Sequence, residues 1–117
     1  MSVAYRDIIL STKPKDFSMA LDLQFVLFND GDGFYAMSGG HKIGEITFVR
    51  AGLDRMIIDH TAVDAPYRNV GVGCALVRRA VEFARAQRRK IIPLCPFALA
   101  MFNRHPEFND VRMMHSH

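Results

Sequence analysis

The sequence predicts a mixed α/β fold (α+β, with a mixed sheet), in which an antiparallel strand meander precedes a β-α-β crossover and a second helix. Four apolar runs are separated by short clusters of turn-forming residues, which is typical of antiparallel neighbours. A strongly amphipathic stretch follows at 71–88, and a short β-branched run comes after it at 90–94. Because a helix connects the fourth run to the fifth, we expect those two strands to pair in parallel.

The strands are bounded by glycine and aspartate. In the first strand Leu21, Leu23, Phe25 and Leu27 recur at every second position. Asp-Gly and Gly-Gly pairs supply the turns, since these residues tolerate positive φ. The predicted strands are Leu21–Phe28, Phe34–Ser38, Lys42–Val49 and Arg55–Val63.

The helices carry clear stop and start signals. Apolar residues of the stretch Gly71–Arg88 fall on one helical face, with arginines on the other. Lys90–Leu94 reads as the fifth strand, Pro96 opens a helix over Phe97–Arg104, and His105-Pro106 ends it. Phe108–Met114 is predicted as a final strand.

Composition limits the class of protein. The 117 residues suggest one domain at 21–114, preceded by a poorly defined extension at 1–20. A net charge of +3 and a pI near 9.1 suit a polyanionic ligand such as a nucleotide without requiring nucleic acid. Cys74 and Cys95 are expected to be reduced thiols. We find no signal peptide or membrane-spanning run, and therefore expect a cytoplasmic protein.

The most informative stretch is the junction between the fourth strand and the long helix. Its glycines, Gly71 and Gly73, carry no Cβ, and the N–H groups at the start of a helix have no intrahelical partner. Such a junction can hold a phosphate. It is not a P-loop, because no Gly-Lys-Ser/Thr follows, and Leu76 replaces the third glycine of a dinucleotide fingerprint. A flexible loop without a ligand is the alternative interpretation.

The run Arg68-Asn69-Val70-Gly71-Val72-Gly73 matches the Q/R-x-x-G-x-G/A signature of the GCN5-related N-acetyltransferase (GNAT) superfamily, and occupies the same place after the fourth strand. Together with Ile58-Asp59-His60-Thr61, Ile91–Phe97 and His105-Pro106-Glu107-Phe108, it makes the chain resemble the minimal, single-domain branch of that superfamily over about residues 24–112.

This resemblance implies an acyl-CoA-binding domain with acetyl-CoA as cosubstrate. It places the cofactor pyrophosphate on the loop that begins at Arg68, on the amides of Asn69, Val70, Gly71, Val72, Gly73 and Cys74. It also implies that the pantetheine arm lies between the fourth and fifth strands, against the backbone of Ala62 and Val63.

Cys95 and His60 are the candidate catalytic residues. Cys95 follows the fifth strand between two prolines, and is either an acyl acceptor or a donor to the leaving thiolate; a small buried side chain is the alternative. His60 suits a general base, and strand alternation predicts that it shares a face with Met56 and Ile58; a structural histidine is the alternative. The segment 97–102 lacks the tyrosine that many GNAT enzymes use as an acid.

The leading hypothesis is therefore a small N-acetyltransferase in which an amine attacks acetyl-CoA directly within a ternary complex. So short a chain favours an exposed acceptor, such as a protein lysine, an N-terminus or a small polyamine. The alternatives are a CoA-binding module with little catalytic activity, and a basic adaptor that uses 78–90 on a nucleic acid or acidic partner. Nucleic acid is disfavoured because aromatic residues do not alternate with those arginines, Phe83 being the single aromatic in 78–90. No metal site is predicted, since His41 stands where the calcium-loop pattern that begins at Asp30 needs its last carboxylate.

Overall fold

The structure, a computed structural model, describes residues 23–113 and contains a five-stranded sheet in the order β1-β2-β3-β4-β5. Neighbouring strands from β1 to β4 are antiparallel, whereas β4 and β5 are parallel, which confirms the mixed sheet and the crossover. The strands are β1 (Leu23–Leu27), β2 (Gly33–Ser38), β3 (His41–Arg50), β4 (Arg55–Val63) and β5 (Lys90–Pro93).

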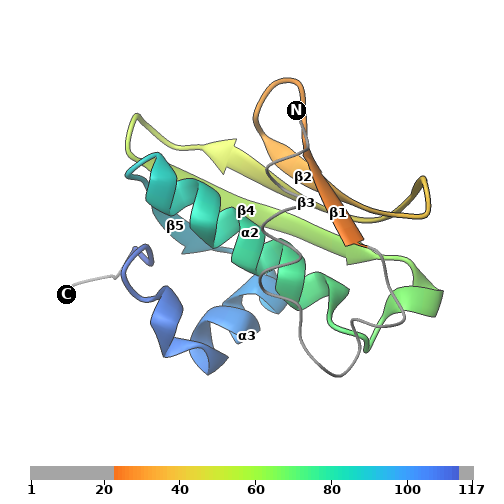
Figure 1. The fold of residues 1–117 in the computed structure, drawn as a ribbon. Helices are drawn as coiled ribbons and strands as arrows, with labels where there is room; N and C mark the ends of the chain where they lie inside the picture. Colours follow the sequence, from red (N-terminus) through yellow and green to blue (C-terminus); the bar gives the residue numbers. More distant parts are fainter. Residues whose placement is uncertain (1–22, 114–117) are drawn as a thin grey trace.

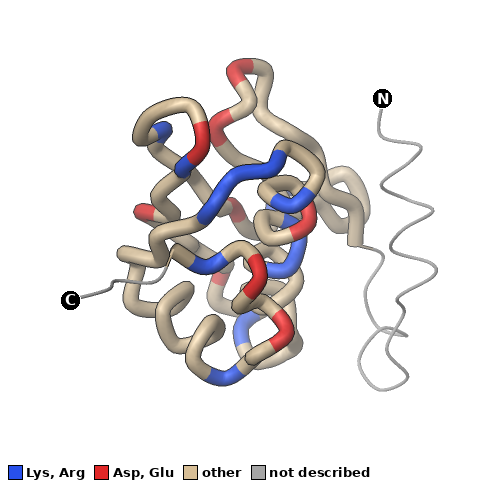
Figure 2. Tube along the Cα trace, turned by 90° about the vertical axis from the view of Figure 1, so that its left-hand side faces the viewer, with Lys and Arg blue, Asp and Glu red and all other residues tan. Residues whose placement is uncertain are grey.

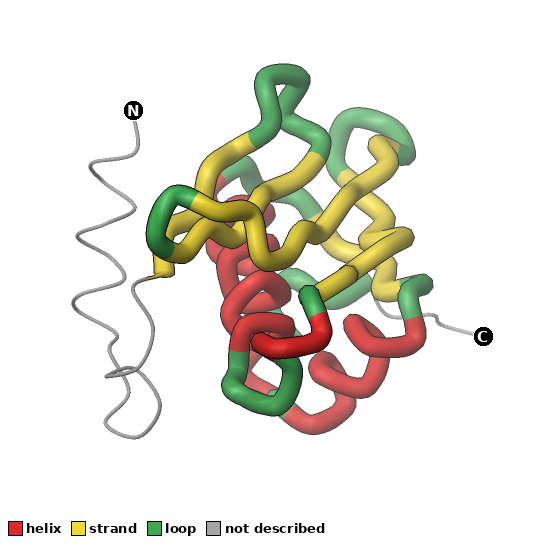
Figure 3. Tube along the Cα trace, turned by 90° about the vertical axis from the view of Figure 1, so that its right-hand side faces the viewer, coloured by secondary structure: helices red, strands yellow, loops and turns green. Residues whose placement is uncertain are grey.

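Both helices lie on the same face of the sheet, as Figures 1 and 3 show. Helix α2 (Val72–Ala86) packs across β2 to β5, and α3 (Pro96–Arg104) packs against β4, β5 and α2. Short 3-10 turns, η2 (Ala65–Tyr67) and η3 (Pro106–Phe108), follow β4 and α3. Within residues 23–113 neither helix covers the other face of the sheet, here called the open face, and the strands alternate between buried and accessible side chains.

The core lies between the sheet and α2. Phe34, Phe48 and Phe83 form an aromatic cluster, with ring centroids 5.5 to 6.1 Å apart. Phe34 is fully buried, and burial of such a side chain contributes about 1.5–3 kcal/mol. The apolar stripe of α2 that the sequence predicts supplies the opposite wall of this core.

The predicted final strand over Phe108–Met114 is wrong. Residues 106–108 form η3, and only an isolated bridge joins Arg112 to Ile91. Pro106 opens the 3-10 turn, and the buried residues Phe108 and Val111 are three apart, which is a helical rather than a strand spacing. Helix α2 also ends earlier than predicted, because Arg88 adopts a φ of 58°.

The predicted extension at 1–20, the first two residues of the predicted first strand, and Met114 lie outside the described residues. Within residues 23–113, neither of the two α-helices is both long and apolar enough to cross a bilayer.

Candidate functional site

The loop that joins η2 to α2 presents backbone N–H groups. Asn69 and Gly71 adopt φ values of 68° and 92°, which turn the chain sharply before the helix begins at Val72. Among residues 23–113, no hydrogen-bond acceptor is recorded for the N–H groups of 69–74, and the first helical bond runs from Ala75 N to Gly71 O, at 3.0 Å. These groups lie at the positive end of α2, where an anion is stabilised.

The strands β4 and β5 separate beside this loop. Their pairing ends at Ile58 and Pro93, after which the N–H groups of Leu94 and Cys95 both donate to the Ile58 carbonyl. The chain then turns into α3, while β4 continues to Val63. In the described part of the chain, residues 59–63 of β4 therefore have no strand partner on the β5 side.

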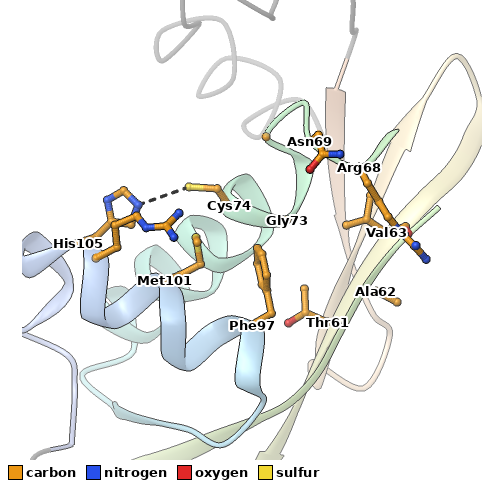
Figure 4. A pocket seen from close by; sticks show the side chains of 12 residues that line it. Thr61, Ala62, Val63, Arg68, Asn69, Gly73, Cys74, Phe97, Met101 and His105 are labelled. Carbon is orange, nitrogen blue, oxygen red and sulfur yellow. Dashed lines mark hydrogen bonds between the residues drawn. The ribbon is translucent and has the colours of Figure 1, made fainter. Parts of the chain in front are cut away.

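A cavity of about 670 Å³ connects the loop to the separated end of β4 (Figure 4). Its wall includes seven of the nine residues predicted to contact the cofactor: Ala62, Val63, Arg68, Asn69, Gly71, Gly73 and Cys74. The other two, Val70 and Val72, pack against or within the hydrophobic core and do not line the cavity.

Five further wall residues were not predicted: Thr61, Phe97, Met101, Arg104 and His105. Phe97, Met101 and His105 recur every four residues and so form one stripe of α3 and its C-terminal cap. That spacing is visible in the sequence, but only the packing of α3 against α2 shows that the stripe faces the loop.

Gly73 lets α2 and α3 approach each other closely. A Cβ at this position would lie 2.6 Å from Cζ of Phe97. The Phe97 ring, which is 38% exposed, therefore rests against the helix backbone and forms part of the cavity wall. The second glycine of the signature is required here by contact, whereas Gly71 is required by its positive φ.

Arg68 fastens the loop to the end of β4. Its Nε donates a hydrogen bond of 2.9 Å to the Val63 carbonyl, so that carbonyl is already engaged. Arg104 lies on the same cavity wall, at the end of α3. The two guanidinium groups add fixed positive charge to the bare amides, and the combination suits a ligand with several negative charges.

Cys95 lies next to the cavity without lining it. It is the N-cap residue of α3 and is 7% exposed. Its Sγ donates a long hydrogen bond of 3.7 Å to Oγ1 of Thr61, which does line the cavity. The sulfur is therefore held at the point where β4 and β5 separate, as the sequence predicts.

The predicted orientation of His60 is wrong. The register pairs Thr47 with His60 but Phe48 with Ile58, so Asp59 is an extra residue that makes a β-bulge and reverses the alternation. His60 therefore faces away from buried Ile58, and its Nε2 lies 3.5 Å from Oε2 of Glu45 on the open face of the sheet. No contact between His60 and Cys95 is recorded within the described residues.

The arginines of α2 are paired with carboxylates. Arg79 contacts Glu82, and Arg85 makes two hydrogen bonds of 2.7 Å to Asp110. The Arg85 bonds hold the pKa of Asp110 below its usual value. Figure 2 shows basic and acidic residues interspersed on one side of the molecule.

The residues from 23 to 113 contain no cluster of three or more His, Cys, Asp or Glu side chains that could hold a metal ion.

Comparison with known proteins agrees with this geometry. A family model described as GCN5-related N-acetyl-transferase matches residues 33–111. A GCN5-like protein from Staphylococcus aureus is 27% identical, with a TM-score of 0.60 over 80% of this chain and 90% of that one. Rv2747 from Mycobacterium tuberculosis, solved in complex with CoA, is 25% identical over 65% of this chain and 48% of that one, with a TM-score of 0.56.

An IAA acetyltransferase from Bacillus cereus shares the fold at 18% identity, with a TM-score of 0.53 over 89% of this chain and 67% of that one. The chain spans only 45% of Ard1 from Thermoplasma volcanium, another protein of similar structure. No curated protein matches the sequence.

Proposed function

The chain belongs to the GCN5-related N-acetyltransferase family, and from that premise we propose that it transfers an acetyl group from acetyl-CoA to an amine by direct attack in a ternary complex. The observation that carries the proposal is the cavity, which connects a loop of bare N–H groups to the separated end of β4. CoA has both parts that such a site needs, a phosphorylated end and a long polar arm that ends in sulfur.

The residues present fit this cosubstrate. The N–H groups of 69–74 suit the pyrophosphate, with Arg68 and Arg104 supplying charge. The edge of β4 at Ala62 and Val63 has no strand partner on the β5 side and suits the amides of the pantetheine arm. Because Arg68 already holds the Val63 carbonyl, the arm would bond the other backbone groups of this edge. Acetyl-CoA supplies the activated acetyl group. The protein's own groups must orient that group, take the proton from the amine and give a proton to the leaving thiolate.

Two of those groups lie on either side of the strand end. Cys95 is held on the cavity side, where its thiol can give a proton to a leaving thiolate. His60 lies on the open face, where its imidazole can take a proton from an incoming ammonium group. Glu45 and Asp59 are carboxylates on this face and would attract a cationic amine. An amine that arrives from the open face, such as a protein lysine, an N-terminus or a polyamine, fits this arrangement.

A CoA-binding module without turnover is the second candidate, because α3 offers no tyrosine to protonate the leaving group. The adaptor hypothesis has less support, since the α2 arginines are occupied by carboxylates.

The test begins with calorimetric titration of acetyl-CoA, which we expect to bind and to raise the melting temperature. The absence of binding would reject both CoA-dependent candidates. Acetyl transfer to a polyamine and to a lysine peptide is then compared for His60→Ala, Cys95→Ala and a matched control, His41→Ala, at an exposed histidine that begins β3. A lost acid or base should lower turnover roughly 100-fold or more, and His41→Ala should leave it unchanged. Full activity in both test variants would contradict the catalytic assignments, and binding without turnover in the wild type would favour the module.

A further inference from the structure

Cys74 and His105 lie side by side in one wall of the cavity (Figure 4), and Glu107, outside that wall, contacts the far nitrogen of the His105 ring. Sγ of Cys74 lies 3.9 Å from Nε2 of His105, and Nδ1 of the same imidazole lies 3.3 Å from Oε2 of Glu107. Cys74 belongs to the first turn of α2, His105 caps α3, and Glu107 lies in η3. A thiol, an imidazole and a carboxylate in this order form the arrangement that activates a nucleophile.

The imidazole is held firmly in place. The His105 N–H donates to the Met101 carbonyl at 3.0 Å, the His105 carbonyl accepts from Phe108 at 3.0 Å, and the ring packs 5.2 Å from that of Phe108. Pro106 restricts the backbone on the other side. The position of the imidazole between the thiol and the carboxylate is therefore supported by both the backbone and the neighbouring ring.

The electrostatics select one tautomer of His105. A hydrogen bond from the Glu107 backbone N–H to its own carboxylate, followed by the charge of Arg78, holds the pKa of Glu107 below its usual value, so the carboxyl is ionised at neutral pH. An ionised carboxylate accepts the Nδ1 proton, which leaves the Nε2 lone pair facing the Cys74 thiol. Arg104 lies on the same cavity wall as Cys74, and Cys74 belongs to the positive end of α2, so an anionic reagent is attracted to this position.

From this geometry we propose that Cys74 is a covalent modification site for small anionic disulfides, and that its modification closes the cavity to acetyl-CoA. His105 takes the thiol proton at Nε2. The Cys74 thiolate then attacks one sulfur of the disulfide, a new S–S bond forms, the old one breaks, and the other half leaves as a thiolate. The disulfide itself is the oxidant, and a thiol reductant reverses the step. The reactivity of Cys74 does not depend on the proposed function, whereas the effect on acetyl-CoA does.

Cys95 provides the contrast within the same protein. It is buried, and its sulfur contacts a threonine hydroxyl rather than an imidazole. Cys74 is only partly buried and lines the cavity. A disulfide in solution should therefore react at Cys74 first.

The test measures the rate at which oxidised glutathione modifies the full-length protein at neutral pH, followed by intact mass and peptide mapping. Wild type and Cys95→Ser should be modified at equal rates at Cys74, while Cys74→Ser should not be modified on that timescale. His105→Gln should slow the reaction by ~10-fold or more, because the general base is lost. The exposed Glu107→Gln should slow it severalfold without a folding defect, which circular dichroism checks.

Modification of Cys95 first, or an unchanged rate in a folded Glu107→Gln and His105→Gln pair, would overturn the proposal. Calorimetry then compares acetyl-CoA binding before and after modification, and after dithiothreitol. We expect binding to be lost and then restored. Binding that persists on the fully modified protein would overturn the blocking step, whereas failure of the unmodified protein to bind would reject the proposed function and leave the Cys74 reactivity intact.

Discussion

The contact between Gly73 and Phe97 makes a quantitative test of the cavity wall possible. In Gly73→Ala the new Cβ would lie 2.6 Å from Cζ and 2.9 Å from Cε2 of Phe97, so the ring must move. The ring is 38% exposed and has room to turn, at a cost of about 0.5–1.5 kcal/mol for a side chain away from its preferred rotamer. Alanine favours the helix by up to about 1 kcal/mol. The free energy of unfolding should therefore change by less than ~1 kcal/mol.

Ligand binding should respond more strongly than stability. The displaced ring and the new methyl group share a wall of the cavity, and overpacking of this kind costs about 1–3 kcal/mol, which corresponds to roughly 5- to 150-fold in affinity. We expect calorimetry to show acetyl-CoA binding weakened within that range. Urea denaturation of the same sample measures the stability.

Removing the Phe97 ring separates two effects of the alanine at position 73: its contact with the ring and its helix propensity. In a Phe97→Ala background the clash is absent, so Gly73→Ala should stabilise the protein by about 0.5–1 kcal/mol through helix propensity alone. A double-mutant cycle on stability should then give a coupling energy equal to the cost of displacing the ring, about 0.5–1.5 kcal/mol. Strictly additive effects of the two substitutions, on both stability and binding, would refute the reasoning.

Substitutions at two further positions test other parts of the same framework. Gly71→Ala forces a Cβ into a φ of 92° and should cost about 1–2 kcal/mol in a urea melt, with Gly71→Asn costing less because asparagine tolerates this region. Asp110→Asn removes the acceptor of two Arg85 bonds. The pKa of Asp110 is lowered in the folded state, so its contribution is complete above its usual value of 3.8 and is lost as the pH falls through the folded value. The stability difference between wild type and variant, at most about 1 kcal/mol for an exposed pair, should therefore be present at pH 7 and vanish in strong acid. A difference independent of pH would contradict this account.

Local patterns predicted most of the fold because each strand and helix carries its own signal. The amphipathic stripe of α2 and the Pro96 start of α3 depend on residues close together in the chain, and both are confirmed. The loop at 68–73 was also predictable, since Gly71 and Gly73 each meet a backbone demand that other residues meet poorly.

Features that depend on tertiary contacts were not predictable in this way. The bulge at Asp59 reverses the face of His60, yet it arises from the register between β3 and β4 and leaves no pattern in the strand itself. Cys74 and His105 are 31 positions apart, and they meet only because α3 packs beside the start of α2. The sequence therefore indicates the kinds of chemistry available, whereas the packing decides which side chains share a cavity.

Thr61 allows the proposed role of Cys95 to be tested at the end of the cavity next to that thiol. It lies one residue beyond His60, lines the cavity, and is the only recorded side-chain hydrogen-bond partner of the Cys95 thiol in the described part of the chain. If that thiol gives a proton to the leaving group, the threonine hydroxyl is a positioning group.

Thr61→Val keeps the β-branched shape and removes this one acceptor. One hydrogen bond contributes roughly 0.5–1.5 kcal/mol, so kcat should fall about 2- to 13-fold. Calorimetric affinity for acetyl-CoA should stay within about twofold, and Thr61→Ser should restore kcat, because the hydroxyl rather than the methyl group orients the sulfur. Equal losses of affinity and turnover in both variants would mean that Thr61 shapes the cavity and does not position Cys95.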